Sequence, residues 1–165
     1  MGLRRLLRHL LMPHWWVIRA FDRATLTAIA TAVADSERRH RGELRFVVEG
    51  LLPVGDLLRG ITARQRASDL FAQLRVWDTE ENSGILIYVQ LADRRVEILA
   101  DRGIAARVAQ SDWDAICRAM ERAFKAGDYR GGALEAMRQA GEILARHFPA
   151  GERNPNELPD MPVVL

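Results

Sequence analysis

The sequence predicts an α/β sandwich, in which a small mixed β-sheet of three to four strands has helices on both faces. Two observations lead to this fold class. Segments with helical spacing of apolar residues alternate with short β-branched runs, in the order helix, strand, helix, strand, strand, helix, helix. The chain has 165 residues, of which 48% are hydrophobic and 28% charged, which is typical of one globular domain.

The first third of the chain predicts one helix and one strand. Apolar residues recur at helical spacing over residues 22–41, and Asp22 or Thr25 can cap the start of this helix. Residues 42–50, GELRFVVEG, alternate Leu44, Phe46 and Val48 on one face, as a strand does. A loop with Pro53 then leads to the next helix.

A second helix and a β-hairpin follow. Thr62 and Gln65 have the spacing of a capping box, which starts a helix that ends near Arg75. Residues 85–89, ILIYV, predict a central strand buried on both faces. A tight turn joins it to a strand in residues 94–100, RRVEILA, so these two strands are antiparallel. The strand–helix–strand crossover makes the first two strands parallel.

The last two helices are predicted from their caps. Ser111 and Asp114 again have capping-box spacing, and Gly127 ends the helix that they start. Asp128 opens the final helix. The chain is therefore divided into a basic aromatic arm, an α/β domain and a Pro-rich flexible tail, which are residues 1–21, 22–148 and 149–165.

Charge and cysteine content exclude several classes of protein. The formal net charge is +2, and the pI is about 9.2, which does not predict nucleic-acid binding. Residues 1–23 carry five Arg and one acid, a net charge of +4, so the remaining 142 residues carry −2. Cys117 is the single cysteine, so no intramolecular disulfide forms, and no His or Cys spacing matches a zinc site.

The arm permits two interpretations. It packs on the domain, or it anchors the protein at a membrane surface or a membrane protein. The second interpretation uses arginines for lipid headgroups and tryptophans at headgroup depth. The contact residues would be Arg4, Arg5, Arg8, Trp15 and Trp16. Neither a signal peptide nor a transmembrane helix is expected, so the predicted location is cytoplasmic and peripheral at the inner membrane face.

An acidic loop precedes the central strand. In a hairpin the start of one strand and the end of the next lie at the same edge, so residues 78–83 should lie beside Asp101. Oxygen ligands of this kind suit Ca²⁺ or Mg²⁺, and the alternative is a solvated loop. The candidate metal ligands are Asp78, Glu80, Glu81, Asn82 and Asp101.

Two other motifs favour structural roles. Ser36 and His40 lie four residues apart, like a nucleophile and a base, but no orienting acid or oxyanion hole accompanies them. Cys117 lies between apolar positions of a helix and is interpreted as a packed side chain.

Three stretches together resemble the TPM domain family, whose best-studied members include a thylakoid-lumen phosphatase. ENSGILIYV in residues 81–89 is similar to the family's polar entry into a strand. RRVEILADRGI in residues 94–104 is similar to its strand, Gly-containing turn and helix. FKAGDYRGGALEAM in residues 124–137 resembles its junction between two helices.

The resemblance implies an α/β/α sandwich and an acidic site for calcium or another divalent cation. It also implies acid phosphatase activity in some members, and membrane-protein repair or assembly in others. Asn82 and Ser83 match the family's acidic or amide pair, although Ser83 replaces what is often Asn or Asp. Asp101 stands where relatives often have Gly.

The sequence thus favours a TPM-like accessory domain that binds a divalent cation and acts near a membrane or a membrane protein complex. One alternative is a metal-dependent acid phosphatase, in which the same carboxylates hold the metal and position water. The other is a purely structural interaction module. Whether the protein is an enzyme is left open by the sequence.

Overall fold

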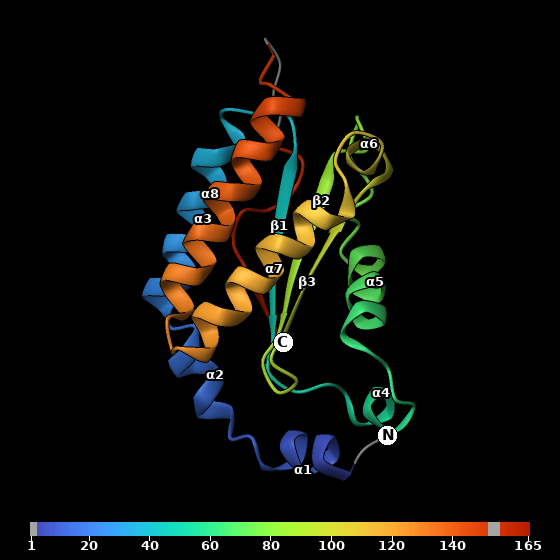
Figure 1. Cartoon of the computed structure of the whole chain (residues 1–165), viewed down its shortest axis with the longest axis vertical. Helices are drawn as coiled ribbons and strands as arrows, with labels where there is room; N and C mark the ends of the chain where they lie inside the picture. The colour runs from blue at the N-terminus through green and yellow to red at the C-terminus, as the bar shows by residue number, and fades with distance from the viewer. Residues whose placement is uncertain (1–2, 152–155) are drawn as a thin grey trace.

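The structure is a computed structural model that describes residues 3–151 and 156–165, and it has the predicted α/β fold (Figure 1). Its mixed sheet has the strand order β3-β2-β1-β4. The strands are β1 (Glu43–Glu49), β2 (Gly84–Gln90), β3 (Arg95–Ala100) and β4 (Val163–Val164). The first three were predicted, and β4 was not.

Strand pairing fixes which loops meet. β1 and β2 are parallel, with Glu43 opposite Gly84, and β2 and β3 are antiparallel, with Ile85 opposite Ala100. The starts of β1 and β2 therefore lie at the same edge of the sheet as the end of β3. This edge carries the acidic loop, as the sequence predicts.

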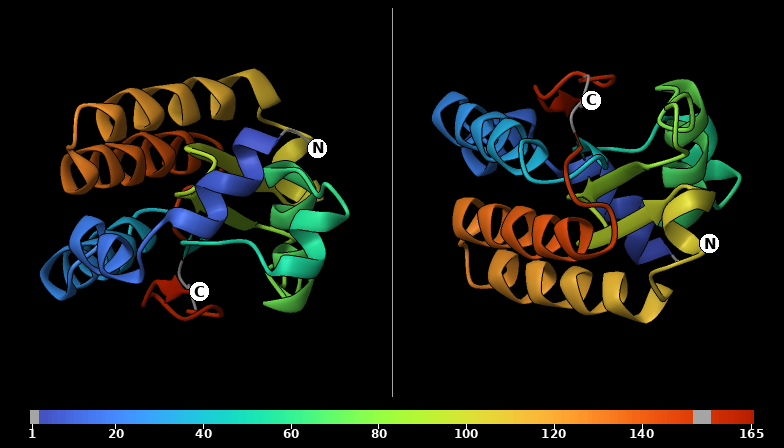
Figure 2. Two further views of the ribbon diagram at one scale, coloured as in Figure 1. Left: turned by 90° about the horizontal axis from the view of Figure 1, so that it is seen from below. Right: turned by 90° about the horizontal axis from the view of Figure 1, so that it is seen from above.

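Helices cover both faces of the sheet, in three layers (Figures 1 and 2). On one face, Leu44, Phe46 and Val48 pack in a core with α3 (Arg23–Glu37), α7 (Gln110–Lys125) and α8 (Tyr129–His147). On the other face, Val47, Leu86 and Tyr88 pack with α5 (Ala63–Gln73). β2 is buried along its whole length, which confirms the prediction of a central strand.

Three of the four predicted helix starts are confirmed, among them Asp128, which accepts the Gly131 N–H at 2.8 Å and caps α8. Asp22 accepts a hydrogen bond from the Thr25 N–H, and Thr62 and Gln65 form both halves of a capping box. The start predicted at Ser111 is wrong, because α7 begins at Gln110, after Ala109, so Ser111 lies inside its first turn. The Asp112 N–H donates to the Ala109 carbonyl there.

The arm forms α1 (Leu3–Leu11) and α2 (His14–Ala20), which fold back across the turn end of the sheet (Figures 1 and 2). α2 buries Val17 and Ala20 in the larger core. Beside α1 lies α4 (Val54–Leu58), and α6 (Arg102–Ala105) lies near the acidic loop. Within residues 3–151 and 156–165, no helix has the length and apolarity needed to cross a membrane.

The end of the chain forms the short edge strand β4. The Leu165 N–H donates to the Val48 carbonyl at 2.9 Å, and the Gly50 N–H donates to the Leu165 carbonyl at 3.0 Å. The sequence predicts a flexible tail here, and the structure instead pairs its last residues with β1. The physical reason is that an uncovered β1 edge would leave backbone hydrogen-bonding groups without partners.

Candidate functional site

The acidic loop and the start of α6 form one compact unit at the edge of the sheet. The Ser83 N–H donates to Thr79 Oγ1, and Asn82 adopts a left-handed backbone conformation with φ of 52°. The Gly103 N–H then donates to the Asn82 carbonyl at 3.1 Å. The predicted proximity of this loop to Asp101 is therefore present in the structure.

Not all the predicted ligands converge. Asn82 and Asp101 lie together, because Arg102 donates through Nε to Asn82 Oδ1 at 2.8 Å and through its N–H to Asp101 Oδ1 at 2.7 Å. Glu81 is paired with Arg41 instead. Asp78 and Glu80 are exposed. Among the described residues, no group of three or more His, Cys, Asp or Glu is arranged to hold a metal.

Two buried oxygens in this unit have no hydrogen-bond partner. They are Asp101 Oδ2 and Ser83 Oγ. A buried carboxylate oxygen without a partner costs about 1–3 kcal/mol or more, so it calls for an explanation. A hard cation or ordered water would satisfy both atoms.

Two buried carboxylates lie near this loop, Glu43, whose place beside it follows from the start of β1, and Glu37, which no sequence pattern indicated. Glu43 accepts hydrogen bonds from the N–H groups of Glu157 and Leu158, at 3.2 and 2.9 Å. Glu37 accepts one from the Leu44 N–H at 2.8 Å, and burial, helped by the charges of Glu43 and Asp160, raises its pKa to about 8. The contacts of Glu43 with Glu157 and Leu158 depend on the ordered tail, which no local pattern in the sequence indicates.

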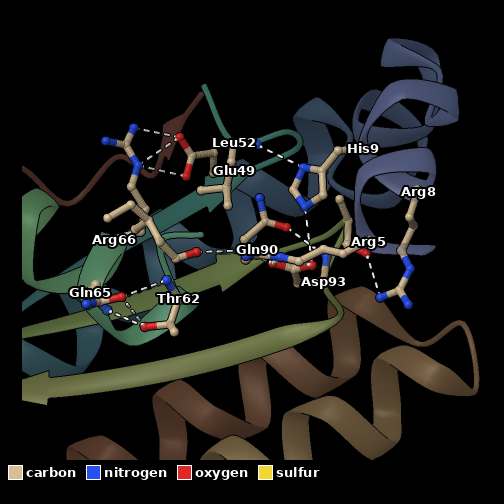
Figure 3. A network of polar contacts seen from close by, with 12 residues as sticks. Arg5, Arg8, His9, Glu49, Leu52, Thr62, Gln65, Arg66, Gln90 and Asp93 are labelled. Atoms are coloured by element: carbon tan, nitrogen blue, oxygen red, sulfur yellow. Dashed lines mark hydrogen bonds and ion pairs between the residues drawn. The ribbon is translucent and has the colours of Figure 1, made fainter. Parts of the chain in front are cut away.

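A polar network fastens the arm at the opposite end of the sheet (Figure 3). Arg5 binds Asp93 through Nε and Nη2, with the shortest contact at 2.7 Å, and also donates to the Ile61 carbonyl. His9 Nδ1 accepts the Leu52 N–H at 3.2 Å, so Nε2 is the atom that donates to Asp93 Oδ1 at 3.2 Å. Burial alone would raise the pKa of Asp93, but the contacts with Arg5 and His9 lower it on balance.

This network gives α1 an inside-out orientation, with polar side chains toward the domain and leucines toward solvent. Arg5 and His9 face the domain, and the guanidinium of the otherwise exposed Arg8 donates to the Ala92 carbonyl. Leu7, Leu10 and Leu11 face outward, with exposed fractions of 45%, 64% and 75%, whereas Leu6 is half-buried. Trp15 of α2 is 60% exposed, whereas Trp16 is half-buried against Tyr129. Other exposed apolar side chains at this end of the molecule are Ile18, Leu51, Val54 and Leu58.

The predicted arm contacts thus fall into two groups. Arg4 and Trp15 are exposed. Arg5 and Trp16 are engaged with the domain, and Arg8 is exposed although its guanidinium reaches the Ala92 carbonyl.

The pair Ser36 and His40 is structural. Ser36 Oγ and His40 Nε2 lie 2.8 Å apart, but both residues are buried under α8, where Gly141 closes over the Ser36 hydroxyl. Burial lowers the pKa of His40 to about 4. No substrate can reach this hydroxyl. Cys117 is buried, and burial raises its thiol pKa to about 12, so it is packed as predicted.

The layered fold and the polar loop at the mouth of β2 define a small α/β/α domain with a candidate site at one sheet edge. The family model of the TPM domain matches residues 19–143, and the chain belongs to this family. The resemblance seen in the sequence is thereby confirmed.

Solved structures agree with this assignment. The BA42 protein from the psychrophilic bacterium Bizionia argentinensis is 30% identical, with a TM-score of 0.76 over 86% of this chain and 93% of that chain. The N-terminal domain of a P. gingivalis protein is 19% identical, with a TM-score of 0.63 over 79% and 82% of the two chains, and it shares the fold. A comparison with curated proteins gives no match.

Proposed function

We propose that this chain is a TPM accessory domain that docks peripherally on an anionic membrane surface through α1 and α2. The observation that carries the proposal is the inside-out arrangement of α1. An amphipathic helix normally buries its leucines on the domain, whereas this one directs Arg5 and His9 to the domain and exposes Leu7, Leu10 and Leu11. An exposed apolar patch of this kind marks an interaction surface.

The chemistry of the patch fits the interface of a bilayer. Transferring one leucine side chain from water to an apolar environment yields about 1.5–3 kcal/mol. Trp15 is an amphipathic ring suited to headgroup depth. Arg4, Arg8 and Arg19 are exposed on the same two helices, and each cation near an anionic surface adds about 1 kcal/mol. Because the cytoplasmic leaflet carries most anionic lipid, the proposal includes the inner membrane face as the location.

Vesicle flotation tests this proposal. The full chain should float with vesicles of phosphatidylglycerol and phosphatidylcholine, and less with phosphatidylcholine alone. The double variant Leu10→Glu, Leu11→Glu should lose flotation, and because both side chains are exposed it should still fold. Trp77→Glu is the matched control, since Trp77 is 51% exposed but lies in the acidic-loop region.

Two results would contradict the proposal. The first is an intact chain that does not float with anionic vesicles at low salt. The second is equal flotation of the double variant and the Trp77→Glu control. Binding of the leucine patch to a protein instead of lipid would appear as the first result.

A second function, divalent-cation binding, is favoured by the two unsatisfied oxygens at the other end of the sheet. Asp101 would be the central ligand, with Ser83 of the same unit, and Asp78 and Glu80 of the loop are exposed and have no ion pair among the described residues. Arg41 and Arg102 already occupy Glu81 and the Asn82 side chain. With few protein ligands, water would complete the shell, which suits Mg²⁺ better than Ca²⁺.

Thermal unfolding with added Mg²⁺ or Ca²⁺ tests this second function. A cation at 100 times its dissociation constant stabilises the folded state by about 2.7 kcal/mol. Asp101→Asn keeps the helix cap but removes the charge, so the shift should vanish, while Asp112→Asn, an exposed acid, should keep it. No shift in the intact chain would contradict cation binding. Turnover of a generic phosphate ester that depends on Asp101 would support the phosphatase alternative.

A further inference from the structure

A cavity of about 280 Å³ is lined by residues of α2, the hairpin turn, α7 and the start of α8. Figure 1 shows where these elements lie in the fold. It is separate from the acidic loop, and none of the exposed leucines of α1 lines it. Its wall combines aromatic rings with cationic side chains. The lining residues that matter are Trp16, Arg94, Phe124, Lys125 and Tyr129.

The aromatic wall is held in place by the fold. Trp16 and Tyr129 meet edge to face with ring centroids 5.9 Å apart, and Phe124 lies 5.2 Å from Tyr129. Phe21, which is buried, contacts both Phe124 and Tyr129 at 5.8 Å. Because these rings support one another, the wall exists without a ligand, and binding costs little ordering of side chains.

The charge at the cavity is positive. Glu121 is the one acid among the lining residues, and its carboxylate accepts the Val96 N–H at 3.1 Å and pairs with Arg95 at 3.7 Å. Arg94 and Lys125 are exposed beside the opening. Their chemistry attracts an anion, and the rings offer a flat apolar surface.

We propose that this cavity binds a small organic anion with one aromatic ring, its ring against Trp16, Phe124 and Tyr129 and its charge between Arg94 and Lys125. The volume lies just below the range of roughly 300–1,000 Å³ for small-molecule sites, so one ring fits better than a nucleotide. The anionic group is a carboxylate or a phosphate monoester, since both accept from Arg and Lys.

Titrations followed by ¹H–¹⁵N NMR test the proposal on the full chain, with benzoate and phenyl phosphate as probes. Amide shifts should concentrate in residues 89–95 and 121–129. Benzyl alcohol, which has the ring without the charge, should bind at least about fivefold more weakly, because it forms no ion pair. The stronger of the two anions identifies the ligand class.

Substitutions of the two cations give a second readout. Asparagine tolerates the positive φ of Arg94, which is 56°, so Arg94→Asn removes the charge and keeps the turn. Arg94→Asn and Lys125→Ala should each weaken anion binding by about threefold to fivefold, the upper range for a partly exposed ion pair. Arg122→Ala, an exposed cation on the same helix that does not line the cavity, is the control.

Three outcomes would overturn the proposal. They are no saturable shifts with either anion, shifts centred on α1 in place of the cavity, and equal binding of benzyl alcohol and the anions. Membrane docking is measured without these probes, so the cavity and the docking surface can fail separately.

Discussion

Glu37 shows how a single buried side chain makes stability depend on pH. Its carboxyl group is buried at the end of α3, accepts the Leu44 N–H, and lies near the charges of Glu43 and Asp160. Burial and the two neighbouring carboxylates disfavour the ionised form, and they outweigh the Leu44 hydrogen bond, which favours it, so the pKa is raised. In the unfolded chain the same group would ionise near its usual pKa of 4.5.

The first prediction follows from that difference. Between about pH 4.5 and pH 8 the folded state retains the Glu37 proton and the unfolded state has lost it, so the free energy of unfolding should fall as pH rises through this window. Glu37→Gln should remove this fall, and above pH 8 the variant should be at least as stable as the wild type. Urea unfolding at several pH values measures the free energy of unfolding of both proteins. Parallel pH profiles of stability for the wild type and the variant would show that Glu37 is not the group responsible.

The second prediction concerns the close approach of α6 to the acidic loop. A Cβ atom added at Gly103 would lie 2.5 Å from the Glu81 carbonyl oxygen and 2.7 Å from that of Asn82. Gly103→Ala should therefore displace the loop and lower the free energy of unfolding by about 1–3 kcal/mol. Gly55→Ala in α4 meets no atom within 4 Å and should be neutral or slightly stabilising. Equal effects of the two substitutions would be evidence against this packing.

At the residue scale, the sequence predicted part of the candidate site. The proximity of Asn82 and Asp101 follows from strand direction alone, because a hairpin brings its two open ends together. The pairing of Glu81 with Arg41 could not be predicted, since Arg41 lies far from the loop in sequence. The unsatisfied Asp101 Oδ2 depends on side-chain burial, which no pattern encodes.

At the element scale, α1 is held mainly through one carboxylate. Asp93, in the turn between β2 and β3, receives both Arg5 and His9 from α1 (Figure 3). Because Leu7, Leu10 and Leu11 of α1 are exposed, apolar burial contributes less to its attachment than the polar contacts do. Polar contacts are thus the main attachment of α1, whereas α2 is also packed through Val17.

The third prediction is that Asp93→Ala releases α1 without unfolding the domain. The substitution leaves Arg5 and His9 without their carboxylate, so α1 should detach more often. Limited trypsin digestion should then cut after Arg4, Arg5 or Arg8 sooner than in the wild type. Asp69→Ala, an exposed acid on α5, should digest as the wild type does. Unchanged cleavage of the Asp93 variant would show that other contacts hold α1.

Elements with strong periodicity were predicted correctly, and those set by distant contacts were not. β1, α5, β2 and β3 follow from alternation, continuous apolar runs and a capping box. β4 has only two residues and exists because the β1 edge is available. The orientation of α1 is set by Asp93, which lies 84 residues from His9 in the sequence. It therefore cannot be predicted from the local sequence pattern.

At the scale of the whole molecule, the two candidate surfaces lie at opposite ends of the sheet. α1 crosses the end near the hairpin turn, and the acidic loop lies beside α6 at the other end (Figure 1). Docking through the arm would therefore direct Asp78, Glu80 and Glu81 away from anionic lipid, where they would otherwise be repelled. The charge division seen in the sequence, basic in residues 1–23 and slightly acidic beyond, matches this arrangement.

The most direct test of membrane docking is quenching of Trp15 by brominated lipids in anionic vesicles. Trp15 is exposed on the proposed contact surface, whereas Trp16 packs on Tyr129. Trp113 is buried, and Trp77 directly precedes the acidic loop. The wild-type fluorescence should be quenched at low salt and recover as salt screens the arginines. Trp15→Phe should lose most of this quenching, and Trp77→Phe should retain it. Absence of quenching in the wild type, or equal quenching in the two variants, would contradict docking through the arm.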